Sequence, residues 1–126
     1  MSSSLEDYLE CILLLEQQEG LARSSDIAKR LNVKMSSVNS ALKRLAELKL
    51  ITHSPYSEIH LTKKGGTYAR EIWQRHRMLT TFFEQVLNIA SSVAAENACR
   101  IEHQLDPEVL LQMSVFLKKF QAKKSK

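Results

Sequence analysis

Residues 24 to 48 read SSDIAKRLNVKMSSVNSALKRLAEL, and this stretch decides the fold. In its first part Ile27, Ala28 and Leu31 recur at the spacing of one helix face, and a serine stands before them as an N-cap. The second part also opens on a serine cap and places an apolar face along one side, made of Val38, Ala41, Leu42, Leu45 and Leu48. Only NVK, at 32–34, separates the two parts. Two short helices joined by so short a turn are typical of a helix-turn-helix unit.

The outward face of the second predicted helix carries groups that suit the major groove of DNA. Small hydrogen-bonding side chains and cations can meet base edges there. Directly after this helix, LITHSPYSEIHLT at 50–62 alternates apolar and polar residues around the turn-forming SPYS. This pattern predicts a small β-hairpin, which is the wing of a winged helix-turn-helix domain. The residues that we expect to contact DNA are Lys34, Ser36, Ser37, Asn39, Ser40, Lys43, Arg44 and, in the wing, Tyr56.

The rest of the chain is expected to be helical. Three glycines and two prolines among 126 residues leave few breaks in the apolar periodicity. We expect helices over about 5–19, 63–84 and 91–105, and a last helix with Asp106 as N-cap and Pro107 at its first position. The predicted fold is mainly α, with a winged helix-turn-helix domain over 1–63, an all-helical domain over 64–122 and a basic tail over 123–126.

The composition excludes several classes of protein. At 44% hydrophobic and 25% charged residues it is that of a globular protein, and no apolar run is long enough to span a bilayer. The first residues lack the pattern of a signal peptide, and there are only two cysteines, so we expect a cytoplasmic protein with free thiols. A net charge of +4 permits binding to nucleic acid but does not establish it.

A thiol, a carboxylate and an imidazole lie close together in ACRIEHQL at 98–105. On a helix, residues three and four apart are neighbours, so Cys99, Glu102 and His103 would project from one face. The apolar residues of this helix form a separate stripe. The polar face is therefore either solvated or a binding site for a metal.

Two further helices supply ligand-type residues. Asp7 and Glu10 are three apart in the first helix, and His76 interrupts an apolar stripe in the helix over 63–84. Each has an ordinary structural explanation: Asp7 as the partner of a Ser4 cap, His76 as a hydrogen-bonded core residue, the others as packing or surface groups. Burying several carboxylates costs several kcal/mol per ion, however, and a bound cation removes this cost. The candidate metal ligands are Asp7, Glu10, His76, Cys99, Glu102 and His103.

Motifs of known enzyme classes are absent from the sequence. It contains no Gly-rich phosphate loop, no GxSxG, no HExxH and no CxxC pair. A di-iron bundle would need Glu-x-x-His on two helices, and only one helix offers a comparable group. We therefore expect a binding protein rather than an enzyme.

Five motifs in order carry a resemblance to a known family: LEDYLECILLLEQ, SSDIAKRLNVKMSSVNSALKRL, LTKKG, RHRML and ACRIEHQL. From about residue 5 to 120 the chain resembles the diphtheria-toxin-repressor and manganese-transport-regulator family. This implies a metal-activated, homodimeric repressor that binds operator DNA, with residues 64–122 for metal binding and dimerisation. It also implies ligand roles for Asp7 and Glu10 as in the manganese branch, for Cys99 as in the iron branch, and for His76, Glu102 and His103.

The donor set favours Fe(II) or Mn(II), with Zn(II) as a serious competitor and Co(II) or Ni(II) possible. A metal held by both domains would lock each reading helix at a fixed distance from its symmetry mate, and the regulated process would be metal homeostasis. Three alternatives stay open at this point. They are a winged-helix regulator that senses no metal, a thiol switch using Cys11 and Cys99, and a metalloenzyme or metal-storage bundle.

Overall fold

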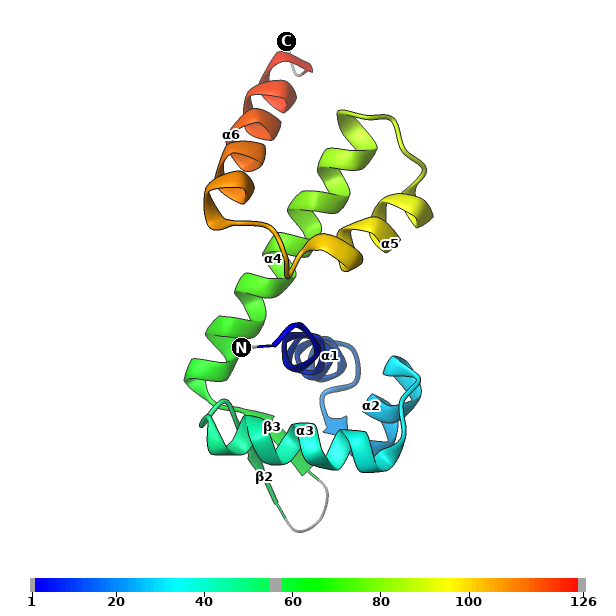
Figure 1. Cartoon of the computed structure of the whole chain (residues 1–126), viewed down its shortest axis with the longest axis vertical. Coiled ribbons are helices and arrows are strands. Elements are labelled where there is room, and N and C mark those ends of the chain that lie inside the picture. The colour runs from blue at the N-terminus through cyan, green and yellow to red at the C-terminus, as the bar shows by residue number, and fades with distance from the viewer. Residues whose placement is uncertain (1, 55–57, 125–126) are drawn as a thin grey trace. The chain divides into compact units, whose positions relative to one another are not determined.

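The structure, a computed structural model, describes residues 2–54 and 58–124 and is mainly helical, as predicted (Figure 1). Contacts divide the chain into two compact units, Met1–Glu71 and Ile72–Lys126. The elements in order are α1 (Ser3–Glu19), β1 (Ala22–Arg23), α2 (Ser24–Leu31), α3 (Met35–Glu47), β2 (Ile51–His53), β3 (Glu58–Leu61), α4 (Lys63–Gln85), α5 (Ser91–Ile101) and α6 (Pro107–Lys124). The boundary predicted between residues 63 and 64 remains a prediction. Tyr56 and residues 125–126 of the tail lie outside the described residues.

Helices α2 and α3 form the predicted helix-turn-helix. Asn32 ends α2 in the left-handed conformation, with a φ of 54°, and the N–H of Val33 then donates to the carbonyl of Ala28. The two apolar faces meet in the core, where Ile27, Val38, Ala41, Leu42 and Leu45 are buried.

The predicted serine caps are wrong. The N-caps are Arg23 and Lys34, and neither makes a side-chain cap hydrogen bond. Arg23 is still paired with Glu58 in the sheet, so the chain leaves strand geometry only at Ser24, which becomes the first helical residue. In α3 the first i→i−4 bond runs from the N–H of Val38 to the carbonyl of Lys34, which starts this helix one residue before its serines.

Helix α1 begins and ends at identifiable caps. The Ser2 hydroxyl accepts from the N–H of Leu5, and Gly20 closes the helix with a φ of 76°, a conformation that glycine adopts without strain. Since Ser2 is the N-cap, the explanation of Asp7 as the partner of a Ser4 cap is wrong. Side chains are buried on more than one side of this helix, including Leu9, Cys11, Ile12 and Leu15.

The sheet of the first unit has three antiparallel strands in the order β1-β3-β2. The predicted hairpin is confirmed by the pairing of Ile51 with Leu61 and of His53 with Ile59. Strand β1, which the sequence reading did not anticipate, pairs Ala22 with Ile59 on the other side. At the end of β3 the Thr62 hydroxyl accepts from the N–H of Gly65, and this cap starts α4 as predicted.

The second unit contains the later turns of α4 together with α5 and α6. Its buried apolar side chains include Ile72 and Leu79 of α4, Ala94 and Ala98 of α5, and Leu117 of α6. Helix α5 ends at Ile101, several residues earlier than predicted, and α6 begins at Pro107 as predicted. Among the described residues no helix is both long and apolar enough to cross a membrane.

Candidate metal centre and DNA-binding surface

The centre of the candidate metal site is Glu102, which follows the last residue of α5. The N–H of Glu102 donates to the carbonyl of Ala98. The carbonyl oxygen of Glu102 accepts a hydrogen bond from Nη1 of Arg75, in α4, at 2.8 Å. The side chain of Glu102 is 0% exposed. A carboxylate is rarely buried to this extent unless it is paired or binds a metal. The local backbone thus fixes a buried anion at the end of α5.

Two imidazoles flank this carboxylate. His76 Nδ1 lies 2.7 Å from Glu102 Oε2, at hydrogen-bonding distance, and His103 Nε2 lies 3.2 Å from Oε1. The contact with His103 is short enough for an ion pair, but its angles do not allow a hydrogen bond, so Oε1 makes none. Trp73 stacks on His76 with ring centroids 5.6 Å apart, which restrains the ring. Nitrogen and oxygen donors around a buried carboxylate oxygen that makes no hydrogen bond fit a divalent transition metal.

The other predicted ligands have different surroundings. Asp7 and Glu10 are half-buried, one turn apart on α1 in the first unit. Cys99 lies on the last turn of α5 and is exposed. Within the second unit the structure therefore brings together His76, Glu102 and His103, while Cys99 stays at the surface close by in sequence.

Cys11, the other half of the proposed thiol switch, is buried in α1 at 3% exposure. Burial raises the pKa of its thiol to about 11, against a smaller opposite effect of the Arg30 guanidinium. The reactive species in thiol chemistry is the thiolate. At neutral pH Cys11 stays protonated, which disfavours the thiol-switch alternative.

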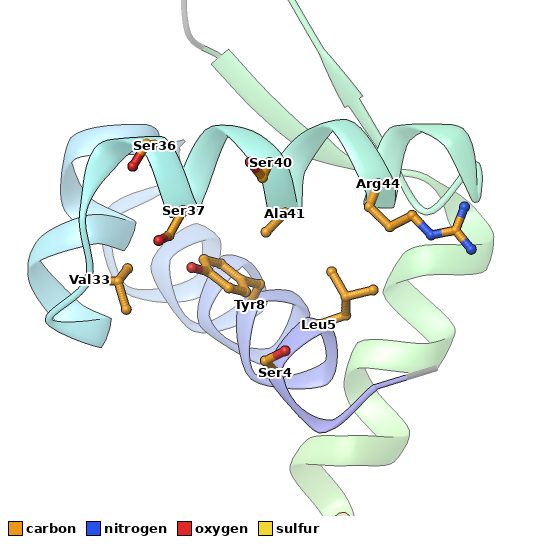
Figure 2. A pocket seen from close by; sticks show the side chains of 9 residues that line it. All are labelled: Ser4, Leu5, Tyr8, Val33, Ser36, Ser37, Ser40, Ala41 and Arg44. Carbon is orange, nitrogen blue, oxygen red and sulfur yellow. The ribbon is translucent and has the colours of Figure 1, made fainter.

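The described residues that were predicted to contact DNA are all exposed, from Lys34 through Arg44. A groove of about 560 Å³ runs between α3 and the start of α1 (Figure 2). Its lining residues are Ser4, Leu5, Tyr8, Val33, Ser36, Ser37, Ser40, Ala41 and Arg44. In Figure 2 Ser37 points toward Tyr8 of α1. Asn39 and Lys43 are also exposed, but they do not line this groove.

Two apolar residues near the start of α3 are exposed, although the sequence did not single them out as candidate contacts. Val33 is 37% exposed and Met35 is 44% exposed. Val33 lies in the turn before α3 and Met35 is the first residue of this helix. An apolar side chain next to a helix that enters the major groove can meet a thymine methyl group.

Two family models match consecutive parts of the chain. Residues 1–59 match the N-terminal DNA-binding domain of the iron-dependent repressors, and residues 62–125 match their metal-binding and dimerisation domain. The chain belongs to the iron-dependent repressor family. It is therefore a metal-dependent transcriptional regulator and not an enzyme, and its partners are DNA and a second copy of itself. The family binds divalent metals.

Individual relatives agree with this family assignment. The regulator is 36% identical over 124 residues to an uncharacterized HTH-type transcriptional regulator of Methanocaldococcus jannaschii, covering 98% of this chain and 99% of that one. It is 35% identical over 119 residues to the transcriptional regulator MntR of Escherichia coli, covering 94% of this chain and 76% of the relative. A solved manganese-dependent transcriptional repressor in complex with manganese superposes with a TM-score of 0.81 at 25% identity. That match covers 90% of this chain and 52% of the solved chain, so the regulator spans about half of its length.

Proposed function

We propose that this regulator is a repressor that binds operator DNA when loaded with Fe(II) or Mn(II) and thereby controls metal homeostasis. The observation that carries the proposal is the buried Glu102 carboxylate between the imidazoles of His76 and His103. Without a cation, this carboxylate is fully desolvated and only one of its oxygens accepts a hydrogen bond. A divalent cation bound here would offset the cost of burying the negative charge and would be ligated by the carboxylate and the two imidazoles.

The full ligand set that we propose is Asp7, Glu10, His76, Cys99, Glu102 and His103. His76, Glu102 and His103 are supported by their mutual contacts in the second unit. Asp7, Glu10 and Cys99 join the set through the family resemblance. Carboxylates favour Mn(II) or Fe(II), whereas a thiolate shifts the preference toward Fe(II), Co(II), Ni(II) or Zn(II). Ligation by Cys99 requires its thiolate, so metal affinity should rise with pH near neutrality.

Exposed apolar side chains of the second unit supply a surface for the second copy. A groove of about 450 Å³ between α4 and α6 is lined by Phe82, Val86, Val109, Met113 and Phe116, with two polar residues. Phe116 is 52% exposed although its ring lies 6.0 Å from that of Phe82. Large apolar side chains exposed on a domain of a dimerising family are expected to be covered by the partner subunit. We propose that α6 contributes to the dimer interface.

For DNA, we propose that Asn39, Ser40 and Lys43 meet base edges while Lys34 and Arg44 contact phosphates. Ser36, Ser37 and the wing residue Tyr56 complete the proposed set. A dimer that fits successive major grooves holds its two α3 helices about 34 Å apart. If this arrangement binds metal more tightly than others, linkage requires that the metal-loaded protein bind DNA more tightly. A coupling of about 1–3 kcal/mol is usual, which is roughly a 5- to 150-fold change in affinity.

The test is the affinity for duplex DNA with and without metal. Duplexes are selected from a random-sequence library in parallel with EDTA, Mn(II) and Fe(II), under reducing conditions, and their affinities are measured by fluorescence anisotropy. We expect tighter binding with Mn(II) or Fe(II), lost in Glu102→Gln and retained in the control Glu96→Gln, because Glu96 is an exposed carboxylate paired with Arg100 on the same helix. Equal affinity in all conditions would favour a metal-independent regulator. Sensitivity to oxidant that Cys99→Ala abolishes, without a metal effect, would favour a thiol switch.

A further inference from the structure

Besides Glu102, the carboxylate of Glu6 is also buried. Glu6 lies in helix α1, directly before the proposed ligand Asp7. Glu6 is 6% exposed although it stands in the first turns of the helix. The hydroxyl of Tyr68, in the second turn of α4, donates to Glu6 Oε2 at 2.9 Å. Both residues belong to the first unit. A hydrogen bond therefore links α1 to α4 at the level where α1 presents Asp7.

The Tyr68–Glu6 hydrogen bond can fix the rotation of α1 about its own axis, which apolar packing alone defines less sharply. Apolar contacts, such as those of the buried Leu9 and Ile12, have no preferred direction. A hydrogen bond is directional and weakens steeply when its angle changes, and one to an ionised carboxylate is stronger than a neutral one. Glu6 and Glu10 are four residues apart on α1 and so lie on the same side of the helix. Fixing Glu6 therefore fixes the direction in which the helix presents Glu10.

We propose that the Tyr68–Glu6 hydrogen bond is a positioning contact that presets α1 for metal binding, so that Tyr68 acts on metal affinity through Asp7 and Glu10. The inference rests on the proposed function, since it takes Asp7 and Glu10 as ligands. Tyr68 itself is not a ligand in this proposal. Removing the Tyr68 hydroxyl should allow α1 to rotate, so that only a fraction of the molecules holds α1 in the orientation that binds metal. The apparent metal affinity then falls in proportion to that fraction.

The primary variant is Tyr68→Phe, which removes one hydroxyl and keeps the ring. Mn(II) affinity is measured by isothermal titration calorimetry, and DNA affinity by anisotropy at saturating Mn(II). We expect Mn(II) to bind about tenfold more weakly, as loss of a hydrogen bond to a charged group predicts. DNA affinity at saturating Mn(II) should stay within about twofold of wild type. The matched control is Tyr8→Phe, which deletes a tyrosine hydroxyl that faces the groove beside α3. It should leave Mn(II) affinity unchanged.

A merely structural role predicts a different result. Loss of stability alone would lower the melting temperature and weaken DNA binding in a way that saturating Mn(II) does not restore, and that result would overturn the proposal. A double-mutant cycle with Glu6→Ala sharpens the test: Tyr68→Phe should add no further loss of Mn(II) affinity once Glu6 is gone. Additive losses would contradict a shared contact. If wild type shows no metal-dependent DNA binding, the proposed function fails; if it does and Tyr68→Phe binds Mn(II) like wild type, only this inference fails.

Discussion

Replacing Glu102 with glutamine should have opposite consequences with and without metal. Glutamine has the same shape and keeps an acceptor for His76, but it carries no charge. The Glu102 carboxylate is fully buried and its Oε1 makes no hydrogen bond, so a neutral side chain here avoids the cost of desolvating a charge. We expect the free energy of unfolding of metal-free Glu102→Gln to equal or exceed that of wild type.

The magnitude with metal follows from mass action. At a free Mn(II) concentration about 100 times its Kd, wild type gains about 2.7 kcal/mol in the free energy of unfolding. Loss of a side chain that merely supports a ligand costs about 10- to 100-fold in metal affinity, so loss of the central anionic ligand should cost at least about a hundredfold. At the same Mn(II) concentration the variant would then gain only about 0.4 kcal/mol.

The assay is urea denaturation followed by circular dichroism, in EDTA and in Mn(II), at one protein concentration because a dimer's stability depends on it. The result to compare is the Mn(II)-induced shift in each protein, not the absolute stability. An equal shift in wild type and Glu102→Gln would refute the assignment of Glu102 as a ligand. A marked loss of stability of the variant in EDTA would refute the account of the buried charge.

Three further predictions, two of them with a control substitution, concern the fold and the dimer. Gly65→Ala should lower the free energy of unfolding, measured in urea, by about 1–3 kcal/mol or more, because an added Cβ would collide with the backbone carbonyl of residue 50. In the control Gly66→Ala the added Cβ meets only a flexible arginine side chain, so this change should be tolerated. Glu16→Leu should cost about 1–3 kcal/mol by leaving the Leu61 N–H without its acceptor, and Glu16→Gln should recover most of this loss. Phe116→Lys should raise the dimer dissociation constant at least about tenfold in analytical ultracentrifugation, and an unchanged value would exclude α6 from the interface.

The DNA-binding unit was largely predictable from sequence because its signals are local. The apolar positions of α2 and α3 fall on the predicted faces, and the Thr62 cap and the hairpin are where the pattern put them. What failed was the start of each short helix. Strand β1 is only two residues long, and it exists because β3 lies beside it, which no local pattern reveals. Its pairing with β3 displaced the expected cap at Ser24.

The candidate metal site was predictable in residue type but not in geometry. Periodicity continues through Leu105, so the sequence predicted one helical face for Cys99, Glu102 and His103. The chain instead leaves the helix after Ile101, and Pro107 starts the next helix. Arg75 then holds the carbonyl of Glu102 from α4. A contact between residues 27 apart in sequence cannot be deduced from periodicity.

The carboxylate of Glu16 accepts a backbone hydrogen bond from β3 at a position that β1 is too short to reach. Strand β1 ends its pairing at Ile59, two residues before Leu61, and Glu16 Oε1 accepts the Leu61 N–H at 3.1 Å. An amide left open at this edge would offer a template on which a strand from another chain could add. By occupying it with a side chain, α1 closes this part of the β3 edge to pairing with a foreign strand.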